Sequence, residues 1–235
     1  MSTLPAKGEY PQSGDTLDWA DYHSRWEALW TKEGGLKVGD NWDRGVSARP
    51  LVETLAAGSV AGVAVKGSRA LVPGCGRGYD VEALLRAGAA AAVGLEISPT
   101  AQAEASRFLD GQGLGDARAN ARVELRDFFD GPAPGDAPFD LGYDYTFFCA
   151  IHPDMRAEWA RKWAGFLRQG GALVAVVFPV DASKEGGPPW AVTPDAYREA
   201  LVPAGFEVVS LDKVPDDKSF PDRVGREYLL VARRI

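Results

Sequence analysis

The segment Leu71-Val-Pro-Gly-Cys-Gly-Arg-Gly-Tyr79 decides the fold, because its glycine loop directly follows a short apolar strand (70–73) and precedes a helix (80–87). Glycine lets the backbone turn sharply and come close to a bound group. The loop also lies at the start of the helix, where the helix dipole is positive. The segment therefore predicts a ligand site, with a tight turn that requires glycine for its own conformation as the structural alternative.

Strand and helix patterns alternate outward from this loop. The predicted helices of the alternating part cover 80–87, 98–109, 153–167 and 193–202. The predicted strands cover 70–73, 90–96, 122–125, 139–145, 171–178, 206–211 and 227–232. The run 171–178 is almost continuously apolar, as is typical of a strand buried on both faces. The alternation predicts an α/β fold, a doubly wound and mostly parallel sheet of seven strands, whose last two strands pair antiparallel at one edge.

The residues before the first strand form an extension rather than a second domain. We expect a single domain over 1–235, with a flexible arm over 1–15 and a helical extension over 16–62. Within the extension, apolar residues at three- and four-residue spacing predict one helix through about residue 32, and a second helix covers about 50–55.

The composition is that of an acidic globular protein. The chain has 26 Lys and Arg against 33 Asp and Glu, a net charge of −7, and the basic residues are scattered, so we expect no nucleic-acid partner. No run approaches ~18 apolar residues, so we expect no membrane span. The cysteines, Cys75 and Cys149, fit neither a disulfide framework nor, with only two His, a metal site. We therefore expect a monomeric, cytoplasmic protein without a metal.

An acidic residue at the end of the second strand indicates which ligand the loop binds. Glu96 stands 22 positions after Gly74, about where a carboxylate accepts hydrogen bonds from ribose hydroxyls. A dinucleotide-binding loop reads GxGxxG, but here the glycines alternate and Tyr79 occupies the place of the third glycine. This pattern suits a cofactor without phosphates, whose amino-acid part rests over the loop.

A further acidic residue follows the third strand. Asp127-Phe128 supplies a carboxylate and an aromatic face suited to an adenine ring, with a solvated acid in a turn as the alternative for Asp127. Together with Gly74 and Glu96, in this order along the chain, the pair favours S-adenosylmethionine as the cofactor. A nicotinamide-dependent oxidoreductase fits less well, because the glycine pattern differs and the sequence has no evident proton-relay pair.

Several motifs in combination resemble a known family. They are Trp26-x-x-x-Trp30, Trp42-Asp43-x-Gly45, the loop 71–78, Gly94-Leu-Glu-Ile-Ser98, Asp144-Tyr-x-Phe-Phe-Cys-Ala-Ile151 and Gly186-Gly-Pro-Pro189. The chain from about 26 to 205 resembles the thiopurine methyltransferase-like family, and within it the plant and fungal thiol and halide methyltransferases. The resemblance implies a Rossmann-like class I methyltransferase fold with an N-terminal helical lid.

The resemblance also implies which residues contact S-adenosylmethionine. Carried over to this chain, they are Trp26, Trp30, Trp42, Gly74, Glu96, Asp127, Phe128 and Tyr145. Two features depart from the family: Glu96 stands where the halide-type enzymes usually have Asp, and the segment 32–41 is longer than usual. An aromatic lid agrees with the chemistry, since a sulfonium cation is attracted to aromatic faces. Packing of an amphipathic helix on the core is the alternative for each tryptophan of the first pair.

The candidates for the acceptor side follow the fourth and fifth strands, at the carboxyl edge where α/β sites open. We name Tyr145 and Arg156 as catalytic candidates: Tyr145 to border cofactor and acceptor, and Arg156 to steer an anionic acceptor. Packing or salt bridging at the helix start is the alternative for Arg156. We expect Cys149 to be a small buried hydrophobe, and the loop 184–190 to form either an apolar wall or a purely structural turn.

The absence of a nucleophile–base pair agrees with methyl transfer. In-line displacement from a sulfonium depends mainly on alignment and desolvation, and a thiol of pKa ~8.5 is already partly thiolate at neutral pH. The sequence therefore predicts an S-adenosylmethionine-dependent S-methyltransferase acting on a small thiol, including a dithiol metabolite. The alternatives are methylation of halide, bisulfide or thiocyanate, and a catalytically silent module that only binds the cofactor.

Overall fold

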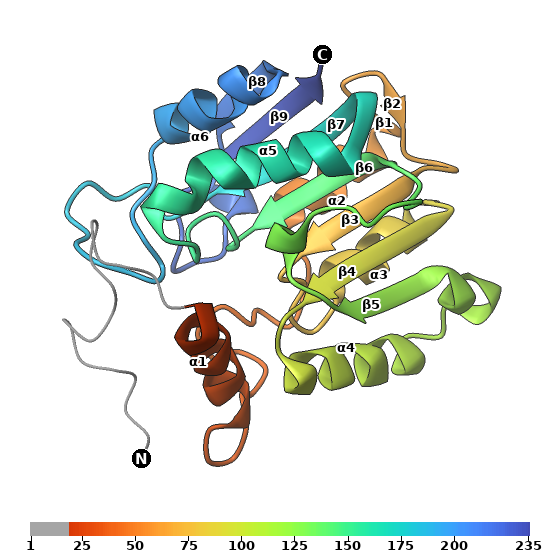
Figure 1. The fold of residues 1–235 in the computed structure, drawn as a ribbon, viewed down its shortest axis with the longest axis vertical. Helices are drawn as coiled ribbons and strands as arrows, with labels where there is room; N and C mark the ends of the chain where they lie inside the picture. The colour runs from red at the N-terminus through yellow and green to blue at the C-terminus, as the bar shows by residue number, and fades with distance from the viewer. Residues whose placement is uncertain (1–18) are drawn as a thin grey trace.

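A seven-stranded sheet runs through the centre of the computed structural model, which describes residues 19–235 (Figure 1). The strands, in chain order, are β3 (Arg69–Pro73), β4 (Ala91–Glu96), β5 (Ala121–Leu125), β6 (Phe139–Tyr145), β7 (Leu167–Val177), β8 (Phe206–Lys213) and β9 (Tyr228–Arg234). In space they are ordered β5-β4-β3-β6-β7-β9-β8, and β9 runs antiparallel to the other six strands. The predicted seven-stranded, mostly parallel sheet is confirmed, with the reversed strand one place in from the edge.

Helices cover both faces of this sheet. α5 (Arg156–Phe166) and α6 (Pro194–Leu201) pack on one face, while α2 (Arg49–Ala56) and α3 (Tyr79–Arg86) pack on the other. Figure 1 shows α5 in front of the sheet and α2 and α3 behind it. α4 (Pro99–Gly111) lies beside the edge strand β5. The doubly wound arrangement predicted from the alternation is therefore confirmed.

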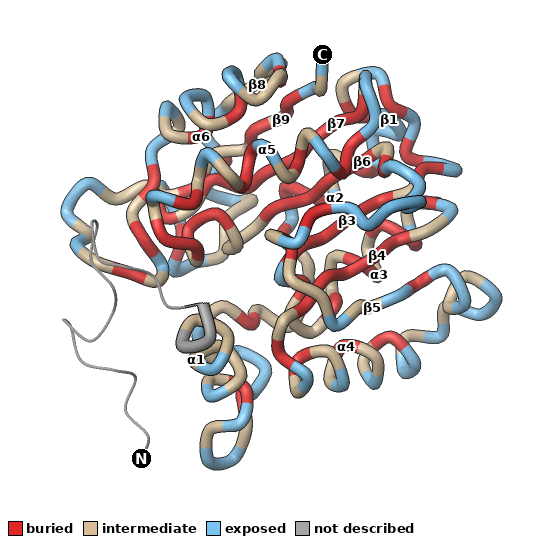
Figure 2. Tube along the Cα trace, viewed as in Figure 1, coloured by how far each residue is buried: buried red, intermediate tan, exposed pale blue. Residues whose placement is uncertain are grey.

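The core explains the apolar run in the middle of the chain. The part of β7 from residue 171 to 177 is buried throughout, and its alternate side chains enter two hydrophobic clusters, one on each face of the sheet. Figure 2 shows the same burial along the neighbouring central strands. On one face, a Cβ at Gly142 of β6 would lie 2.4 Å from the ring of Trp163, so glycine lets α5 approach the sheet closely.

Two of the helices begin with side-chain caps at the carboxyl edge of the sheet. The Ser98 side chain accepts a hydrogen bond from the N–H of Ala101 at 3.0 Å, and the Thr193 side chain accepts one from Ala196 at 3.1 Å. Such caps satisfy an N–H group that has no partner within the first helical turn. They fix α4 and α6 to start close to where β4 and the segment after β7 end.

The N-terminal extension contains α1 (Trp19–Thr31), α2 and a hairpin of β1 (Ser59–Val60) with β2 (Val63–Ala64). The sequence analysis did not predict this hairpin, because two-residue strands carry no alternating pattern. α1 lies beyond the carboxyl ends of the central strands, beside α4 (Figure 1). The predicted arm over 1–15, and the first residues of the helical extension predicted over 16–62, lie outside the described residues.

Two ion pairs join the N-terminal extension to the connection between β8 and β9. Arg44 pairs with Asp222, and Lys218 Nζ lies 2.5 Å from Glu53 Oε2. The connection 214–227 is therefore held against the extension at the carboxyl edge of the sheet.

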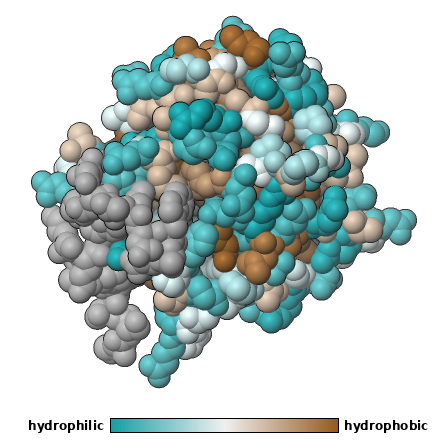
Figure 3. All heavy atoms as spheres, in the orientation of Figure 1, coloured by the Kyte–Doolittle hydropathy of each residue, from teal (hydrophilic) through white to brown (hydrophobic). Residues whose placement is uncertain are grey.

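The described part of the chain includes no helix that is both long and apolar enough to cross a membrane. Its short 3-10 helices are η1 (Gly115–Asn120), η2 (Phe128–Asp130), η3 (Pro153–Met155), η4 (Val202–Ala204) and η5 (Asp216–Lys218). On the face drawn in Figure 3, hydrophilic residues surround small hydrophobic areas.

Candidate active site

A cavity of about 300 Å³ opens at the carboxyl edge of the sheet, between the glycine loop and α1. Its walls come from the glycine loop and the end of β4, from α1 and the loop after it, and from segments that follow β6, β7 and β8. The lining residues of α1 and the loop after it are Tyr22, Trp26, Leu29, Trp30, Asn41, Trp42 and Arg44. Elements far apart in the sequence thus enclose one space.

The glycine loop forms one wall of this cavity. Gly74 and Gly76 line it, and both have positive φ angles (54° and 52°), a conformation that favours glycine. A Cβ at Gly74 would lie 2.6 Å from the ring of Phe147, and a Cβ at Gly76 would lie 3.7 Å from Trp30. Glycine at position 74 is therefore required both for the turn and for the close packing of the Phe147 ring against it.

Glu96 ends β4 with its carboxylate against the glycine loop and is 7% exposed. Its Oε2 accepts a hydrogen bond from the N–H of Gly76 at 3.1 Å, and its Oε1 accepts from Ile97 and Ser98 at 2.9 and 3.2 Å. Burial raises the pKa of Glu96 to about 7, and the backbone N–H groups partly oppose that rise. A buried carboxylate that lines a cavity is suited to accept hydrogen bonds from the hydroxyls of a ligand.

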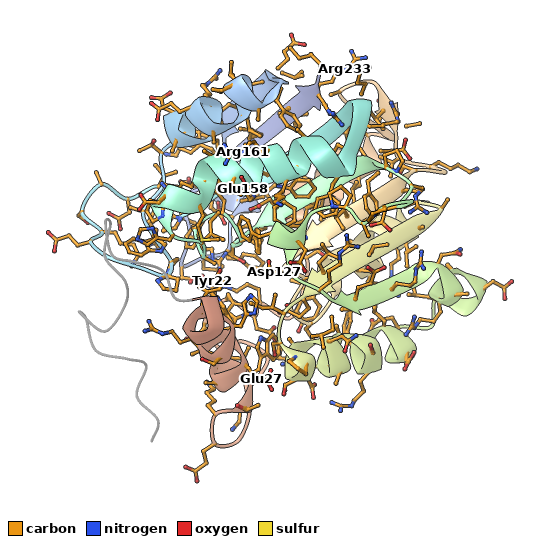
Figure 4. All side chains as sticks on the ribbon, in the orientation of Figure 1. Tyr22, Glu27, Asp127, Glu158, Arg161 and Arg233 are labelled. Atoms are coloured by element: carbon orange, nitrogen blue, oxygen red, sulfur yellow. The ribbon has the colours of Figure 1, made fainter. Side chains whose placement is uncertain are left out.

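A smaller pocket of about 20 Å³, which shares part of this lining, continues the cavity toward Asp127. Asp127 Oδ1 accepts a hydrogen bond from the N–H of Phe129 at 2.8 Å, and its Oδ2 lies 2.7 Å from His23 Nε2 of α1. Figure 4 shows Asp127 near the end of α1 that carries Tyr22. Asp127 thus lies where the small pocket meets α1.

Phe128 lies beneath this pocket. It is 2% exposed, and its ring packs in the core on Phe166 and Trp163, with centroids 5.3 and 5.2 Å apart. The next residue, Phe129, is half-buried, and its ring stacks on that of Phe147 at 6.2 Å and 24°. Because both phenylalanines line the pocket, Phe129 offers a second aromatic face that the sequence analysis did not include.

Three tryptophans face the glycine loop across the cavity, and we call Trp26, Trp30 and Trp42 the tryptophan lid. The ring of Trp42 packs edge-on against Trp26, at 5.4 Å and 75°, and near Trp30, at 6.4 Å and 66°. Trp30 is buried (4% exposed), whereas the other two are half-buried. The structure thus brings together the three tryptophans that the sequence analysis named.

A buried ion pair holds the tryptophan lid to the glycine loop. Asp43, 4% exposed, lies next to Trp42, and its Oδ2 accepts a hydrogen bond from Nε of Arg77 at 2.8 Å. The guanidinium of Arg77 also lies over the ring of Trp30, 5.4 Å from the centroid. In addition, the hydroxyl of Tyr79 donates to Asp43 Oδ1 at 2.9 Å. This gives Asp43 and Arg77 a positioning role that the sequence analysis did not identify.

Glu27 attaches α1 to the start of α4. Its carboxylate accepts hydrogen bonds from the hydroxyls of Ser98 and Thr100, each at 2.5 Å, and Figure 4 shows it between the two helices. Burial alone would raise the pKa of Glu27, but the hydrogen bonds from Ser98 and Thr100 outweigh it and lower the pKa. Glu27 therefore attaches α1 to the chain at Ser98, two residues after Glu96.

Tyr145, a predicted contact of both cofactor and acceptor, is not among the described residues that line the cavity. Its hydroxyl donates to Glu227 Oε1 at 2.6 Å and accepts a hydrogen bond from Nη1 of Arg223. Arg223 does line the cavity and is only 2% exposed. The sequence analysis missed Arg223, since the connection after β8 carries no recognisable motif.

Arg156 is likewise absent from the lining contributed by the described residues. Its Nη2 donates to the carbonyl of Ala191 at 3.0 Å, and its guanidinium carbon lies 4.8 Å from the ring centroid of Phe148. This placement matches the packing alternative at the start of α5 and does not bring Arg156 to the cavity.

A further wall of the cavity, formed by segments after β6 and β7, is apolar. Phe178, after β7, and the adjacent Pro188 and Pro189 line this side of the cavity. Cys149 lines it too, at 1% exposure, and burial raises the pKa of its thiol to about 12, so the thiol stays protonated. The N–H of Trp190 donates to the carbonyl of Cys149 at 2.7 Å, which holds the end of the proline loop in place.

The residues present fit S-adenosylmethionine. The glycine loop exposes backbone to the cavity at Gly74 and Gly76, which suits an amino-acid group, and the buried carboxylate of Glu96 is an acceptor for ribose hydroxyls. The small pocket at Asp127 provides an acceptor and aromatic faces for adenine, and the tryptophan lid provides faces for a sulfonium. Among the described residues, no group of three His, Cys, Asp or Glu side chains is placed to hold a metal ion.

Comparisons with known proteins agree with this fit. The model of the thiopurine S-methyltransferase family matches residues 23–226. Probable thiol methyltransferase 2 of Arabidopsis thaliana is 37% identical over 205 residues, which cover 87% of this chain and 82% of the relative. Thiocyanate methyltransferase 1 of Brassica oleracea is 37% identical over 204 residues, with coverage of 87% and 82%.

A solved structure supports the fold independently. Magnesium protoporphyrin IX methyltransferase from Synechocystis PCC 6803, with bound SAM, has a TM-score of 0.68 at 17% identity, covering 94% of this chain and 99% of that one. At that identity the likeness concerns the fold alone, and it confirms the class I methyltransferase architecture. Since the family model spans most of the sequence and the two plant relatives match over most of their own length, the chain belongs to the thiopurine S-methyltransferase family of S-adenosylmethionine-dependent methyltransferases.

Proposed function

We propose that this protein transfers the methyl group of S-adenosylmethionine to the sulfur of a small thiol. The observation that carries the proposal is one cavity with two chemically different ends. Gly74 and Glu96 lie at one end, and the apolar residues Phe178, Pro188 and Pro189 lie at the other. The names of the plant relatives, a thiol and a thiocyanate methyltransferase, support sulfur as the acceptor atom.

At the first end, each polar group has a part of the cofactor to bind. Glu96 accepts hydrogen bonds from the ribose hydroxyls, and the wall at Gly74 faces the amino-acid part. Asp127 accepts from the adenine amino group, while Phe128 and Phe129 supply the apolar surface beside the ring. The geometric support for these assignments is that these residues line two pockets that share Gly74 and Glu96 in their walls.

The tryptophan lid lines the same cavity and would border the sulfonium of bound S-adenosylmethionine. Its aromatic faces favour the sulfonium cation and exclude water from the transfer. Asp43 and Glu27 keep the lid in place through their bonds to Arg77 and to the start of α4. This arrangement makes closure of the lid a condition for reaction.

When bound, S-adenosylmethionine supplies a methyl group that the acceptor sulfur takes with its lone pair, while the electron pair of the broken bond stays on the S-adenosylhomocysteine that departs. The chain itself aligns the acceptor and removes water. No general base is required for an acceptor that arrives as an anion. The protonated thiol of Cys149 does not compete as a nucleophile.

The two catalytic candidates receive different roles in this proposal. Tyr145 is a positioning residue that acts through Arg223, since its hydroxyl is bonded to that side chain. Arg156 stabilises the loop after β7 through the carbonyl of Ala191. Neither role requires contact with the methyl group.

The proposal extends to the molecule as a whole. We include thiocyanate, halide and bisulfide as alternative acceptors, because one relative is named for thiocyanate. We also infer a monomer that acts as one domain over 1–235, to be checked by light scattering. The free and buried Cys75 and Cys149 support a reducing, cytoplasmic setting.

A direct assay tests the proposal. The purified protein is incubated with S-adenosylmethionine and, separately, with an aryl thiol, an alkyl thiol, a dithiol, thiocyanate and iodide. S-adenosylhomocysteine and the methylated product are measured by mass spectrometry. We expect product with at least one sulfur acceptor. The proposal is wrong if no acceptor yields S-adenosylhomocysteine, and calorimetry with S-adenosylmethionine then separates a silent binding module from a protein that does not bind the cofactor.

A further inference from the structure

We propose that Arg223 holds the negative charge of the acceptor, so that the site selects a small, weakly hydrated monoanion such as a thiolate or thiocyanate. This inference rests on the proposed function and names the residue that determines its acceptor class. It concerns a side chain from the connection between β8 and β9, the part of the site to which the sequence motifs do not extend.

The first support is the charge balance of the cavity. Among the described residues, the charged ones that line it are Arg44, Glu96 and Arg223. Glu96 lies at the glycine loop, where three backbone N–H groups bond its carboxylate. Arg44 is paired with Asp222. Within the described chain, Arg223 is therefore the lining cation without a direct ion pair, and the carboxylate of Glu227 is linked to it only through the Tyr145 hydroxyl.

The second support is an unsatisfied donor. The guanidinium of Arg223 donates to the hydroxyl of Tyr145, whereas its buried Nε has no hydrogen-bond partner. At 2% exposure, solvent reaches this side chain very little. A buried charge with an unused donor is costly. An anion in the cavity would supply the missing acceptor and the missing negative charge together.

The third support is the aromatic frame around the guanidinium. Its carbon lies 4.3 Å from the ring centroid of Phe178, 5.0 Å from that of Tyr145 and 5.8 Å from that of Phe220. Aromatic faces stabilise a guanidinium without neutralising it. The charge is thus held in one place while it remains available to a ligand.

The shape and polarity of the surrounding wall define the anion. Arg223 shares the apolar end of the cavity with Phe178, Cys149 and the prolines at 188 and 189. An apolar wall penalises strongly hydrated ions such as sulfate or phosphate, and one unpaired cation balances one negative charge. Sulfur anions combine a single charge with a large, polarisable and weakly hydrated atom.

Neutralisation of the charge during the reaction follows from the same geometry. The acceptor anion gives a sulfur lone pair to the methyl carbon. The bond between that carbon and the sulfonium sulfur breaks, and its electron pair stays on that sulfur. The acceptor sulfur and the former sulfonium sulfur are then both neutral. For a thiol, the proton passes to solvent when the thiolate binds. The methylated product no longer has a charge for Arg223 to hold, which favours its release.

The experiment compares Arg223→Met and Arg223→Lys with the unsubstituted protein. Thiocyanate is titrated by calorimetry into each protein loaded with S-adenosylhomocysteine, and kcat and KM are measured for thiocyanate and for an aryl thiol. Arg161→Met is the charge-matched control, because Arg161 lies exposed on α5, paired with Glu158 and away from α1 (Figure 4).

We expect Arg223→Met to weaken thiocyanate binding and raise its KM by about 30-fold, since hydrogen bonds to charged groups contribute roughly 1.5–3 kcal/mol. Binding of S-adenosylhomocysteine should change by less than about threefold. Arg223→Lys should give an intermediate loss, because lysine keeps the charge without the planar fork. Arg161→Met should match the unsubstituted protein.

Thiocyanate affinity and KM that stay within about twofold in Arg223→Met, with cofactor binding retained, would overturn the inference. If Arg223→Met does not fold, the same criterion applies to Arg223→Lys. An unsubstituted protein that methylates no acceptor contradicts the proposed function instead. Active enzyme that is indifferent to substitution at Arg223 contradicts only the present inference.

Discussion

The two ends of the cavity are built in different ways. At the cofactor end, Glu96 is the last residue of β4, and Gly74 and Asp127 follow the adjacent parallel strands β3 and β5 within two residues. At the acceptor end, Phe178, Pro189 and Arg223 belong to longer connections after β7 and β8. The cofactor end is thus determined by backbone geometry and tolerates little change. The acceptor end is determined by side chains, whose replacement should alter selectivity before it alters folding.

The largest expected effect is at the cofactor end. Gly74→Ala forces a side chain into a positive φ of 54° and places its Cβ 2.6 Å from the Phe147 ring. We expect affinity for S-adenosylhomocysteine, measured by calorimetry, to fall by about 100-fold. The loop must leave its binding conformation to relieve overpacking and backbone strain, which each cost roughly 1–3 kcal/mol. Gly113→Ala is the matched control, with a positive φ of 63° but no atom within 4 Å. Equal effects of the two substitutions would contradict the close-approach argument.

The second-largest expected effect also concerns the cofactor end, at Glu96. Glu96→Gln keeps the size of the side chain but removes the charge that accepts ribose hydroxyls. We expect affinity for S-adenosylmethionine to fall by about 30-fold, the effect of a lost charge-assisted pair of hydrogen bonds. Calorimetry measures it, and the acceptor KM at saturating cofactor should remain within about threefold. Unchanged cofactor affinity would remove Glu96 from the binding site.

The same substitution should alter the pH dependence of stability. Burial raises the pKa of Glu96 from 4.5 to about 7, so the folded protein binds a proton there that the unfolded chain releases. The contribution of protonated Glu96 to the free energy of unfolding is therefore fully present below pH 4.5 and is lost as the pH rises toward 7. Between pH 5 and 8, the Tm of the ligand-free protein should fall more than that of Glu96→Gln. Asp80 and Asp144, whose pKa values burial raises to about 6, act in the same direction in both proteins. Parallel curves would contradict this pKa.

A smaller effect tests the boundary between the two ends. Tyr145→Phe removes the hydroxyl that accepts from Arg223 and donates to Glu227. We expect the acceptor KM to rise by about fivefold, roughly the effect of one buried hydrogen bond. Affinity for S-adenosylhomocysteine should not change, because Tyr145 does not line the described cavity. Loss of cofactor affinity with an unchanged acceptor KM would return Tyr145 to the cofactor end.

The smallest effect concerns Arg156. Arg156→Met removes a hydrogen bond to the carbonyl of Ala191 and the contact with Phe148. We expect kcat/KM to stay within about twofold and the Tm to fall by a few degrees, as for the loss of about 1 kcal/mol. Assays at two pH values and a thermal melt measure both quantities. An acceptor KM raised by tenfold would place Arg156 at the acceptor end after all.

The comparison also explains what the sequence could predict. The sheet, its helices and the cofactor-end residues follow from local patterns, because a short loop after a parallel strand always opens at the same edge. Glu96 and Asp127 could therefore be placed without a structure. Trp26 and Trp30 could be placed on one side of the same helix, because residues four apart share a helix face.

The acceptor end could not be predicted in this way. Arg223 and Phe178 are 45 positions apart, and their contact depends on how β9 inserts between β7 and β8. At the cofactor end, the degree to which Phe128 packs into the core was also not predictable, because it depends on the packing of α5. Arg156 follows a strand at the correct edge, yet its guanidinium bonds to the neighbouring loop instead of the cavity.

The ion pairs Arg44–Asp222 and Lys218–Glu53 join a part of the molecule that is synthesised early to one that is synthesised late. Translation delivers the glycine loop, Glu96 and the tryptophan lid early, and the connection 214–227 is the last part of the site to emerge. Before that connection is made, a nascent chain carries the glycine loop, Glu96 and the tryptophan lid but lacks Arg223. Because β9 lies between β7 and β8 in the sheet, the acceptor end can be completed only after β9 has been synthesised as well.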